Sequence, residues 1–278
     1  MTDFSPIPFP RASAARRVLA RIAPGPAGPE KTPGAASRTI FHRTVEELAR
    51  WIIRVPVQLE AEGLERIPRQ GPLILVINHI NFLDPLLSYL FTPRYVVGFT
   101  KEESFQEPLA PLFHFVGAIP VRRGTVDRVA LQEALSVLER GEALLISPEG
   151  TRSGHGRLQQ AKTGVVLLAL ASGAPLLPMA IWGQEYFWQN LRRLRRTRVW
   201  MRVGYPFYLR ADTERLSRRD RETILQEVMG QLSALLPPPY RGVYADLDRA
   251  TEHYLLFPPG SESNLRLREP QKPTETHR

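Results

Sequence analysis

Cysteine is absent from all 278 residues of the sequence. This absence excludes disulfide frameworks, cysteine-ligated zinc, iron–sulfur clusters and thiol nucleophiles, whereas metal sites built from His, Asp and Glu remain allowed. The histidines are scattered along the chain without a carboxylate ligand set beside them, so we predict no metal site and no bound cofactor. A chain without cysteine also suits a reducing cytoplasm.

Long uninterrupted hydrophobic runs are scarce as well. Arg16, Arg17 and Arg21 break up the apolar residues of the N-terminal segment, so the sequence predicts no secretory signal peptide. One uncharged stretch, 163–184, has the length that a bilayer-spanning helix of about 20 residues needs. A Ser-Gly-Ala-Pro turn signal at 172–175 divides it into a helix-sized and a strand-sized half, which favours two elements over one transmembrane helix.

Acidic residues are missing from 186–211, where seven arginines are interspersed with Trp and Tyr. Arginine is attracted to an anionic membrane surface by about 1 kcal/mol per residue, and Trp and Tyr favour the membrane interface. We therefore expect a cytoplasmic protein that is peripheral on the inner face of the membrane. A merely solvated charge run is one alternative, and nucleic-acid binding is an alternative of a different class. No nucleic-acid-binding motif accompanies the segment, so we predict no nucleic-acid partner.

The overall composition fits one medium-sized globular domain with appendages, since 43% of the residues are apolar, 23% are charged and the formal net charge is +9. Prolines crowd toward both ends. We predict a flexible, basic, proline-rich leader over 1–42, one folded domain over 43–236 and a polar C-terminal tail over 237–278. A helix is expected from Thr44, and its apolar stripe suits either the protein core or a membrane.

Short apolar runs of strand length alternate with helical patterns through the predicted domain. Strands that are apolar on both faces and separated by helices are typical of parallel sheets. We therefore predict an α/β fold, a single domain with a mostly parallel central sheet and helices on both faces. Thr125 is the expected N-cap of one helix, and Gly173 is expected to end another. The expected strands are 73–77, 95–99, 118–121, 143–147, 176–181 and 199–203, and the later helices are 126–140, 161–172 and 217–236.

The segment after the first expected strand carries His79 and Asp84. Ligands of open α/β sheets bind beyond the carboxyl ends of the strands, so such a segment is a candidate site. Asp84 before Pro85 predicts a helix N-cap with proline at the first helical position. The loop lets the Asp84 carboxylate fold back onto one imidazole nitrogen and leaves the other free to accept a proton. The alternative is a surface histidine beside a capping aspartate.

Two further loops, 122–124 and 148–153, follow other expected strands and carry groups that bind anions. Guanidinium groups match phosphate in a bidentate fork, and exposed backbone N–H groups and hydroxyls add donors. The alternative for such arginines is a solvated sheet edge. The expected oxyanion-binding rim consists of Arg123, Gly150, Thr151, Arg152 and Ser153.

Three charged residues near this edge each allow two interpretations. Glu149 either hydrogen-bonds a substrate hydroxyl or anchors its own loop through the N–H groups of Gly150 and Thr151. Lys101 and Lys162 also lie toward the expected ligand edge, where they either add positive charge or do nothing specific. No Gly-x-Ser-x-Gly motif is present, which favours proton abstraction from a substrate hydroxyl over a Ser-His-Asp triad.

Four sequence blocks occur in order within about 64–207. They are Asn78-His79-x4-Asp84, Gly117-x-Ile119-x-Val121-x-Arg123, Pro148-Glu149-Gly150-Thr151-Arg152 and Pro175-Leu176-Leu177-Pro178. In their order and spacing they resemble the 1-acylglycerol-3-phosphate acyltransferase (lysophosphatidate acyltransferase) family of glycerolipid acyltransferases. Two positions depart from the family's pattern: Ser147 stands where an aromatic residue is more common, and Asn81 where a small hydroxyl residue is common.

The resemblance implies transfer of a fatty acyl group from a thioester donor, acyl-CoA or an acyl carrier protein, to the free hydroxyl of lysophosphatidate in phospholipid synthesis. It implies that His79 is the general base, that Asp84 orients it, and that Arg123 and the 149–152 loop grip the phosphate of the acceptor. The Pro175 to Pro178 block is then expected to shape the site or an acyl pocket. The expected partners are the lysophospholipid, the acyl thioester and an anionic membrane surface, with an acyl carrier protein as a further partner if it is the donor.

Two alternatives remain within and beside this interpretation. A related acyltransferase would use another acceptor, such as a lysophospholipid with a head group or a lyso-aminolipid. A membrane-associated scaffold could keep the fold without activity, but the presence of both His79 and Asp84 disfavours it. The sequence leaves open the donor, the acyl chain length, the acceptor head group, the oligomeric state and the role of both extensions.

Overall fold

A computed structural model describes residues 40–108, 110–122, 127–210 and 216–267 of the chain. The predicted leader lies almost wholly outside these residues, and so do Arg123, Thr125 and the last part of the predicted tail. The predicted N-cap and the first arginine of the predicted oxyanion-binding rim therefore have no structural description.

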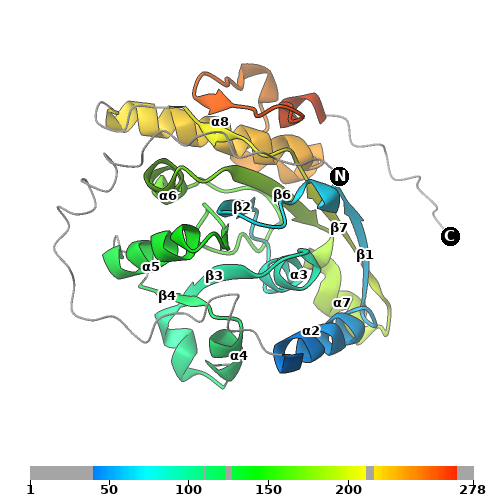
Figure 1. Cartoon of the computed structure of the whole chain (residues 1–278). Coiled ribbons are helices and arrows are strands. Elements are labelled where there is room, and N and C mark those ends of the chain that lie inside the picture. The colour runs from blue at the N-terminus through cyan, green and yellow to red at the C-terminus, as the bar shows by residue number, and fades with distance from the viewer. Residues whose placement is uncertain (1–39, 109, 123–126, 211–215, 268–278) are drawn as a thin grey trace.

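A seven-stranded sheet forms the centre of the molecule, in the order β1-β7-β6-β2-β5-β3-β4 (Figure 1). Paired strands are parallel except β6 and β7, which are antiparallel. This arrangement confirms the predicted mostly parallel sheet. The strands are β1 (Val57–Glu62), β2 (Leu73–Ile77), β3 (Val96–Lys101), β4 (Ile119–Val121), β5 (Ala143–Ile146), β6 (Leu176–Trp182) and β7 (Thr197–Val203).

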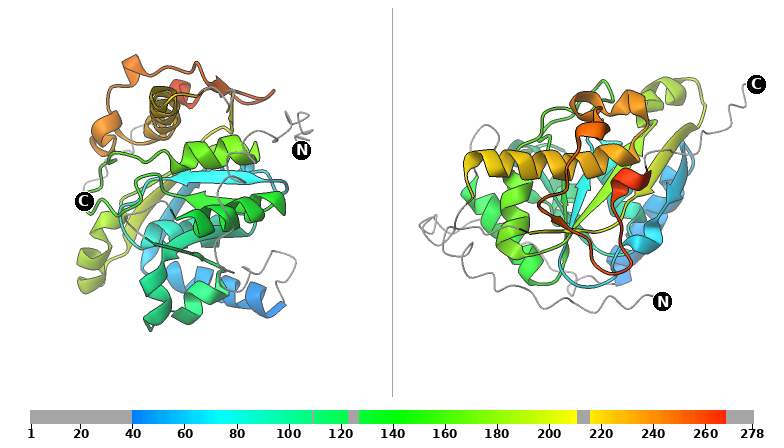
Figure 2. Two further views of the ribbon diagram at one scale, coloured as in Figure 1. Left: turned by 90° about the vertical axis from the view of Figure 1, so that its left-hand side faces the viewer. Right: turned by 90° about the horizontal axis from the view of Figure 1, so that it is seen from above.

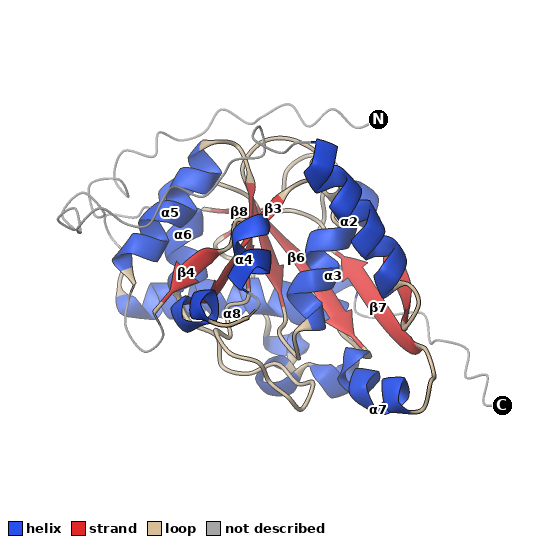
Figure 3. Cartoon of the chain, turned by 90° about the horizontal axis from the view of Figure 1, so that it is seen from below, coloured by secondary structure: helices blue, strands red, loops and turns tan. Residues whose placement is uncertain are grey.

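Helices cover both faces of this sheet (Figure 2). The helices α5, α6 and α8 pack on one face, and α3, with α2 outside it, lies on the other (Figure 3). The fold is therefore the predicted single-domain α/β sandwich. The helices are α2 (Ile40–Ile53), α3 (Leu83–Phe91), α4 (Ala110–Phe115), α5 (Arg128–Glu139), α6 (Gly164–Ser172), α7 (Phe187–Arg192) and α8 (Arg218–Leu235).

The two hydrophobic cores follow from the alternation of side chains along the central strands. In β2, Leu73 and Leu75 face the core beneath α3, while Ile74 and Val76 face the core beneath α5, α6 and α8. All five residues of β2 are buried. A strand with two apolar faces needs a layer of helices on each side, which is the reason for the three-layer architecture.

Several element boundaries differ from the predicted ones. The N-cap of α5 is Asp127, whose side chain accepts a hydrogen bond from the N–H of Ala130, and the helix begins at Arg128, so the predicted start at 126 with Thr125 as the N-cap was wrong. An aspartate at the N-cap satisfies a helix N–H that has no partner within the helix. The strand β1 was not predicted, because its sequence, Val-Gln-Leu-Glu-Ala-Glu, has only one apolar face and lies at the sheet edge.

The uncharged stretch 163–184 forms two elements, as its turn signal predicts. Helix α6 ends at Gly173, which has the left-handed φ of 67°, and strand β6 follows. Within the described ranges, none of the helices combines the length and the apolar character that crossing a membrane requires.

Residues 237–267 pack against the outer side of α8 (Figure 2). They contain five short elements, of which β9 (Leu255–Leu256) pairs with β8 (Tyr208–Leu209) in antiparallel fashion. The buried Glu227 of α8 accepts hydrogen bonds from the backbone N–H groups of His253 and Tyr254. The first thirty-one residues of the predicted polar tail therefore belong to the packed structure. The four 3-10 helices are η5 (Pro238–Tyr240), η6 (Gly242–Tyr244), η7 (Leu247–Arg249) and η8 (Asn264–Leu267).

Candidate active site

His79 and Asp84 meet at the carboxyl end of β2, in the centre of the sheet. The imidazole Nδ1 lies 3.0 Å from Oδ2 of Asp84. Behind them, the side chain of Asn78 bonds both the carbonyl and the N–H of Ile181, at 2.7 and 2.8 Å, which ties the loop to β6. The contact between imidazole and carboxylate is therefore present as the sequence predicts.

The surroundings of Asp84 fix which imidazole nitrogen carries the proton. Asp84 is fully buried, and its Oδ2 also accepts hydrogen bonds from the backbone N–H groups of Ile80 and Asn81. Its Oδ1 accepts one from the side-chain amide of Gln184. A carboxylate surrounded by donors is held as an acceptor, so Nδ1 of His79 is assigned the proton and Nε2 is left as the free acceptor.

The sequence predicts Asp84 as the N-cap of the following helix, and this prediction is wrong. Helix α3 begins at Leu83, its N-cap is Phe82, and Asp84 lies within the first turn. The carboxylate turns back toward the loop instead, because the N–H groups of Ile80 and Asn81 and the imidazole of His79 converge on Oδ2. The side chain of Asn81 accepts a hydrogen bond from the N–H of Leu83 at 2.8 Å and so satisfies the first turn.

Glu149 supports the backbone of this loop from the neighbouring strand. Its Oε1 accepts the N–H of His79 at 2.9 Å and its Oε2 accepts the N–H of Gln159 at 2.8 Å. Glu149 thus anchors a loop, but through His79 and Gln159 rather than the expected Gly150 and Thr151. Burial raises the pKa of Glu149 to about 7, against the lowering effect of these two hydrogen bonds.

The loop after β5 uses several of its backbone donors on the protein itself. The N–H of Ser153 bonds the carbonyl of His79 at 2.7 Å, and that of Gly154 bonds the carbonyl of Ile80 at 3.3 Å. The N–H of Gly150 bonds the carbonyl of Ser147 at 3.1 Å. These bonds hold the 79–80 backbone in place, and they leave fewer free N–H groups for an anion than the sequence suggested.

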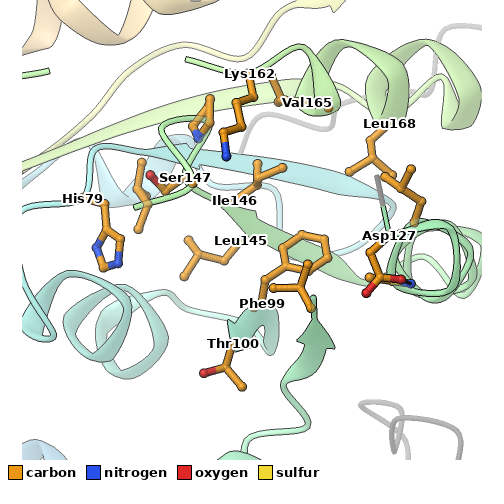
Figure 4. A pocket seen from close by; sticks show the side chains of 18 of the residues that line it. His79, Phe99, Thr100, Asp127, Leu145, Ile146, Ser147, Lys162, Val165 and Leu168 are labelled. Carbon is orange, nitrogen blue, oxygen red and sulfur yellow. Dashed lines mark hydrogen bonds between the residues drawn. The ribbon is translucent and has the colours of Figure 1, made fainter. Parts of the chain in front are cut away.

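A cavity of about 400 Å³ opens in front of His79. His79 lies at one end and Asp127 at the other, with the apolar side chains of Leu145, Ile146 and Phe99 between them (Figure 4). The cavity runs between the carboxyl-terminal halves of the central strands and the helices α5 and α6. Its apolar part is large enough to enclose a chain of methylene groups.

The residues that could bind an anion in this cavity are only partly those that the sequence suggested. Of the predicted ones, Lys101, Lys162 and Gly150 line the cavity, and Arg122 lines it in addition. Arg122 forms a two-point ion pair with Glu102, whereas Lys101 and Lys162 form no ion pair within the described ranges. The structure thus brings His79, Lys101 and Lys162 to one hollow.

The remaining predicted residues either do not line the cavity or are outside the described residues. Arg152 and Thr151 are exposed and do not line the cavity, Glu149 is buried behind it, and Arg123 is outside the described residues. Across the described ranges, the structure shows no group of three or more His, Cys, Asp or Glu that could hold a metal ion.

Several supporting residues were not found from the sequence. Gln184 contacts Asp84 across 100 positions of chain, and no motif marks it. Two tyrosines in the segment after α8 hold the backbone on either side of Gln159. The Tyr244 hydroxyl accepts a hydrogen bond from the N–H of Ala161, and the Tyr240 carbonyl accepts one from the N–H of Leu158. Only the aromatic character of these tyrosines, in a segment otherwise polar, signals a packed position.

Comparison with known proteins agrees with this geometry. Residues 58–182, which contain His79, Asp84 and Glu149, match the family model described as Acyltransferase. Over this segment, somewhat less than half of the chain, the protein is therefore similar to the acyltransferase family. The matched segment runs from β1 to the end of β6, so it contains the site and excludes α8 and the segment that packs on it.

The curated relatives that the chain resembles carry lipid acyltransferase names. It is 30% identical to the 1-acyl-sn-glycerol-3-phosphate acyltransferase of Limnanthes alba over 54% of each chain. It is 27% identical to the protein of that name in Borreliella burgdorferi, over 69% of this chain and 76% of the other. It is 33% identical to the lyso-ornithine lipid O-acyltransferase of Pseudomonas aeruginosa over 55% and 58%. The match therefore spans only about half of two of these relatives.

A solved structure shares the fold. The crystal structure of the 1-acyl-sn-glycerophosphate (LPA) acyltransferase PlsC from Thermotoga maritima superposes with a TM-score of 0.52. The two chains are 25% identical, and the match covers 67% of this chain and 76% of the other. The similarity therefore extends beyond the segment matched by the family model.

Proposed function

We propose that the protein transfers a fatty acyl group from a thioester donor, acyl-CoA or acyl carrier protein, to the free hydroxyl of lysophosphatidate. The observation that carries this proposal is the position of the His79–Asp84 pair at the mouth of a cavity that is apolar beyond it. The names of the curated relatives support the same reaction. The product enters phospholipid synthesis.

The reaction requires a base but no covalent enzyme intermediate. Nε2 of His79 takes the hydroxyl proton as the acceptor oxygen attacks the thioester carbonyl, and Asp84 stabilises the imidazolium that forms. The tetrahedral intermediate then expels the thiolate, which receives the proton from His79 and leaves as a free thiol. Positioned general-base catalysis of this kind contributes about 10² to 10⁴ in rate.

In this proposal the two substrates occupy different parts of the cavity, one charged and one apolar. The ammonium groups of Lys101 and Lys162 supply positive charge beside His79 for the phosphate of the acceptor. In our proposal Arg123 and the exposed Arg152 also contribute to phosphate binding, as the family resemblance implies. The apolar part, toward Leu131 and Leu168, takes the acyl chain, whose burial is worth about 0.8 kcal/mol per methylene.

The lipid acceptor is delivered from a membrane surface in this proposal. Trp188, Leu191 and Leu194 of the α7 region are exposed, Leu194 to 95%. Phe82, between His79 and Asp84 in the chain, packs against Trp188 with ring centroids 5.5 Å apart. This exposed apolar surface, which we call the α7 surface, thus adjoins the catalytic loop directly.

A second exposed apolar surface lies on α2, whose side chains Phe41, Leu48, Trp51 and Ile52 all face solvent. Arg196, just after α7, bonds the backbone carbonyl of Arg54, just after α2, at 2.8 Å, so the segments that follow the two helices are in contact. Solvent-exposed apolar groups of this number favour a lipid surface over water. The predicted membrane-facing alternative for the α2 stripe is therefore the one we adopt.

The basic segment 186–211 contributes only part of its charge to docking. Arg198 and Arg202 form ion pairs with Glu60 and Glu62 of β1, whereas Arg192, Arg193 and Arg195 are exposed beside the α7 surface. These three arginines suit the anionic inner face of a cytoplasmic membrane. We propose this peripheral location for the protein.

A second acceptor class has support of its own. The lyso-ornithine lipid O-acyltransferase of Pseudomonas aeruginosa is 33% identical to the chain, and its name gives a lyso-aminolipid as acceptor. Arg152 does not line the cavity, so the guanidinium cradle expected for a phosphate monoester is incomplete in the described residues. A lyso-aminolipid is therefore the alternative acceptor to assay.

The test is turnover of purified protein with labelled acyl-CoA or acyl carrier protein and either lysophosphatidate or a lyso-ornithine lipid. We expect turnover with lysophosphatidate and a loss of at least about 10² in kcat for His79→Ala. His253→Ala, at an exposed histidine of the C-terminal segment, is the control and should keep full activity. Equal activity of wild type and His79→Ala would refute the mechanism, and turnover only with the lyso-ornithine lipid would replace the acceptor.

A further inference from the structure

Gln184 is fully buried against Asp84 and does not line the cavity. Strand β6 runs parallel to β2, with the last residue of β2, Ile77, opposite Met179, so the end of β6 at Trp182 extends past β2 alongside the loop that carries His79. After β6, Gly183 takes a φ of 94°, and Gln184 begins the 3-10 helix η4 (Gln184–Tyr186). The turn at this glycine directs the glutamine side chain back toward the catalytic loop.

The amide of Gln184 has a single sensible orientation. Its Nε2 donates to Oδ1 of Asp84 and lies 3.3 Å from the carbonyl of Ile181. Both neighbours are acceptors, so the amide nitrogen and not the amide oxygen must face them. The backbone carbonyl of Gln184 accepts from the side chain of Asn81 at 2.7 Å, which fixes the residue to the same loop a second time.

The two oxygens of Asp84 are held by different donors. Oδ2 receives His79 Nδ1 and two backbone N–H groups, whereas Oδ1 receives the amide of Gln184. A buried carboxylate with one unsatisfied oxygen rotates or takes up a proton, and either change weakens the acceptor that orients the imidazole. Within the described residues, His79 is the only ion-pair partner of Asp84, so a neutral donor completes its shell.

We propose that Gln184 is a positioning residue of the acyl transfer, which acts through Asp84 to hold the imidazole of His79 in its reactive orientation. The inference rests on the proposed function for its kinetic test. Gln184 lies beyond the last of the four sequence blocks, so none of the blocks contains it. The inference also explains why a glutamine with no solvent contact sits at the end of β6.

The test compares two substitutions of similar size. Gln184→Met removes the donor at every pH. Gln184→Glu keeps a donor as long as its carboxyl is protonated, which the adjacent carboxylate of Asp84 favours. We expect Gln184→Met to lower kcat about 10- to 100-fold, since a hydrogen bond to a charged group is lost, and to change the KM values less than about threefold. Gln184→Glu is expected to recover part of this loss and to lose it again as the pH rises.

The pH profile separates positioning from packing. Loss of the amide N–H disfavours the ionised form of Asp84. In the plot of kcat against pH, we therefore expect the acid limb, where activity falls at low pH, to move to higher pH by about one unit in Gln184→Met. The titratable groups that face Asp84 are His79 and Glu149, and both keep their other partners in this variant. The control is Gln231→Met, because Gln231 is equally buried and hydrogen-bonded in α8, outside the site.

A readout without substrate makes the inference independent of the acceptor. The proton on Nδ1 of His79, bonded to a carboxylate, gives a downfield NMR signal, which should move in Gln184→Met and stay in Gln231→Met. If wild type is inactive on lysophosphatidate while this signal moves, the proposed function fails and the positioning role stands. If the signal and the acid limb are unchanged in Gln184→Met, or if both Met variants lower kcat equally, the inference is overturned.

Discussion

Glu149 shows how one buried side chain links the catalytic loop to the rest of the protein. Its carboxylate holds the backbone of His79 and of Gln159 while only 2% exposed. Desolvation raises its pKa from 4.5 to about 7, and a rise of this size is equivalent to about 3 kcal/mol. Between these two values the folded protein retains a proton that the unfolded chain has released. The free energy of unfolding therefore falls as the pH rises from 4.5 to about 7.

Glu149→Gln removes this pH dependence. We expect the difference in unfolding free energy between variant and wild type to change by about 3 kcal/mol, in favour of the variant, as the pH is raised from 4.5 through 7. Below pH 4.5 both states of the wild type are protonated, so the difference should level off there. Urea unfolding across this pH range measures it. A difference that stays constant with pH would show that Glu149 does not titrate in this window.

At the scale of elements, the turn after β6 sets the position of the residues behind the catalytic pair. Gly183 has a left-handed φ of 94°, and a Cβ there would lie 2.5 Å from the carbonyl oxygen of Arg198 and 2.9 Å from the Trp200 ring. Both obstacles belong to β7, the antiparallel neighbour of β6. Only glycine therefore allows this turn to pass so close to the next strand.

Gly183→Ala is expected to destabilise the protein and to lower kcat, because the displaced turn carries Gln184. Gly71→Ala is the matched control, since Gly71 has a φ of 84° but no atom within 4 Å of its would-be Cβ. The left-handed conformation alone costs about 1–2 kcal/mol at either position. Gly183→Ala should exceed Gly71→Ala by at least about 2 kcal/mol in urea unfolding. Equal destabilisation of the two variants would contradict the steric argument.

Helix α5 forms one wall of the proposed acyl site. Leu131 lines the cavity, whereas Val129, on the same helix, is exposed and does not line it. Leu131→Trp fills part of the apolar space, so long acyl donors should lose kcat/KM by about tenfold or more while short ones are spared. Val129→Trp should leave the chain-length profile unchanged. Competition between donors of different length measures the profile, and an identical profile in both variants would place the acyl chain elsewhere.

On the scale of the whole molecule, the exposed apolar side chains are concentrated on one side, over α2 and α7. The most exposed of them, Leu194, also has a φ of 54°. A non-glycine residue in this conformation costs about 1–2 kcal/mol and exposes its side chain at no benefit to the fold. The combination favours a role in which the side chain enters a lipid surface.

Leu194→Gly should therefore change stability and membrane affinity in opposite directions. The unfolding free energy should rise by up to about 1 kcal/mol, because glycine adopts the left-handed conformation without strain. Partition onto vesicles with anionic lipid should fall about tenfold, because one buried leucine side chain is lost. Val243→Ala, at another exposed apolar residue, is the control for vesicle binding. Binding should also weaken at 1 M salt, and affinity unchanged by Leu194→Gly would remove the α7 surface from the docking site.

Local patterns in the chain were sufficient to predict most of the elements. Apolar runs predicted six of the seven strands of the sheet, and Gly173 marked the end of α6, because element type depends on neighbours a few residues away. The pairing of His79 with Asp84 was also predictable, since only five positions separate them. The edge strand β1 was not, because its single apolar face gives a weak signal.

The environment of the catalytic pair depends on the order of the strands, which no local pattern encodes. Gln184 reaches Asp84 because β6 lies beside β2, and Glu149 reaches the His79 backbone because β5 lies on the other side of β2. The same order left Arg152 outside the cavity and brought Lys162 into it. Contacts between distant residues form when the sheet assembles, since burial of both its faces selects one arrangement of strands from the many that the separate segments allow.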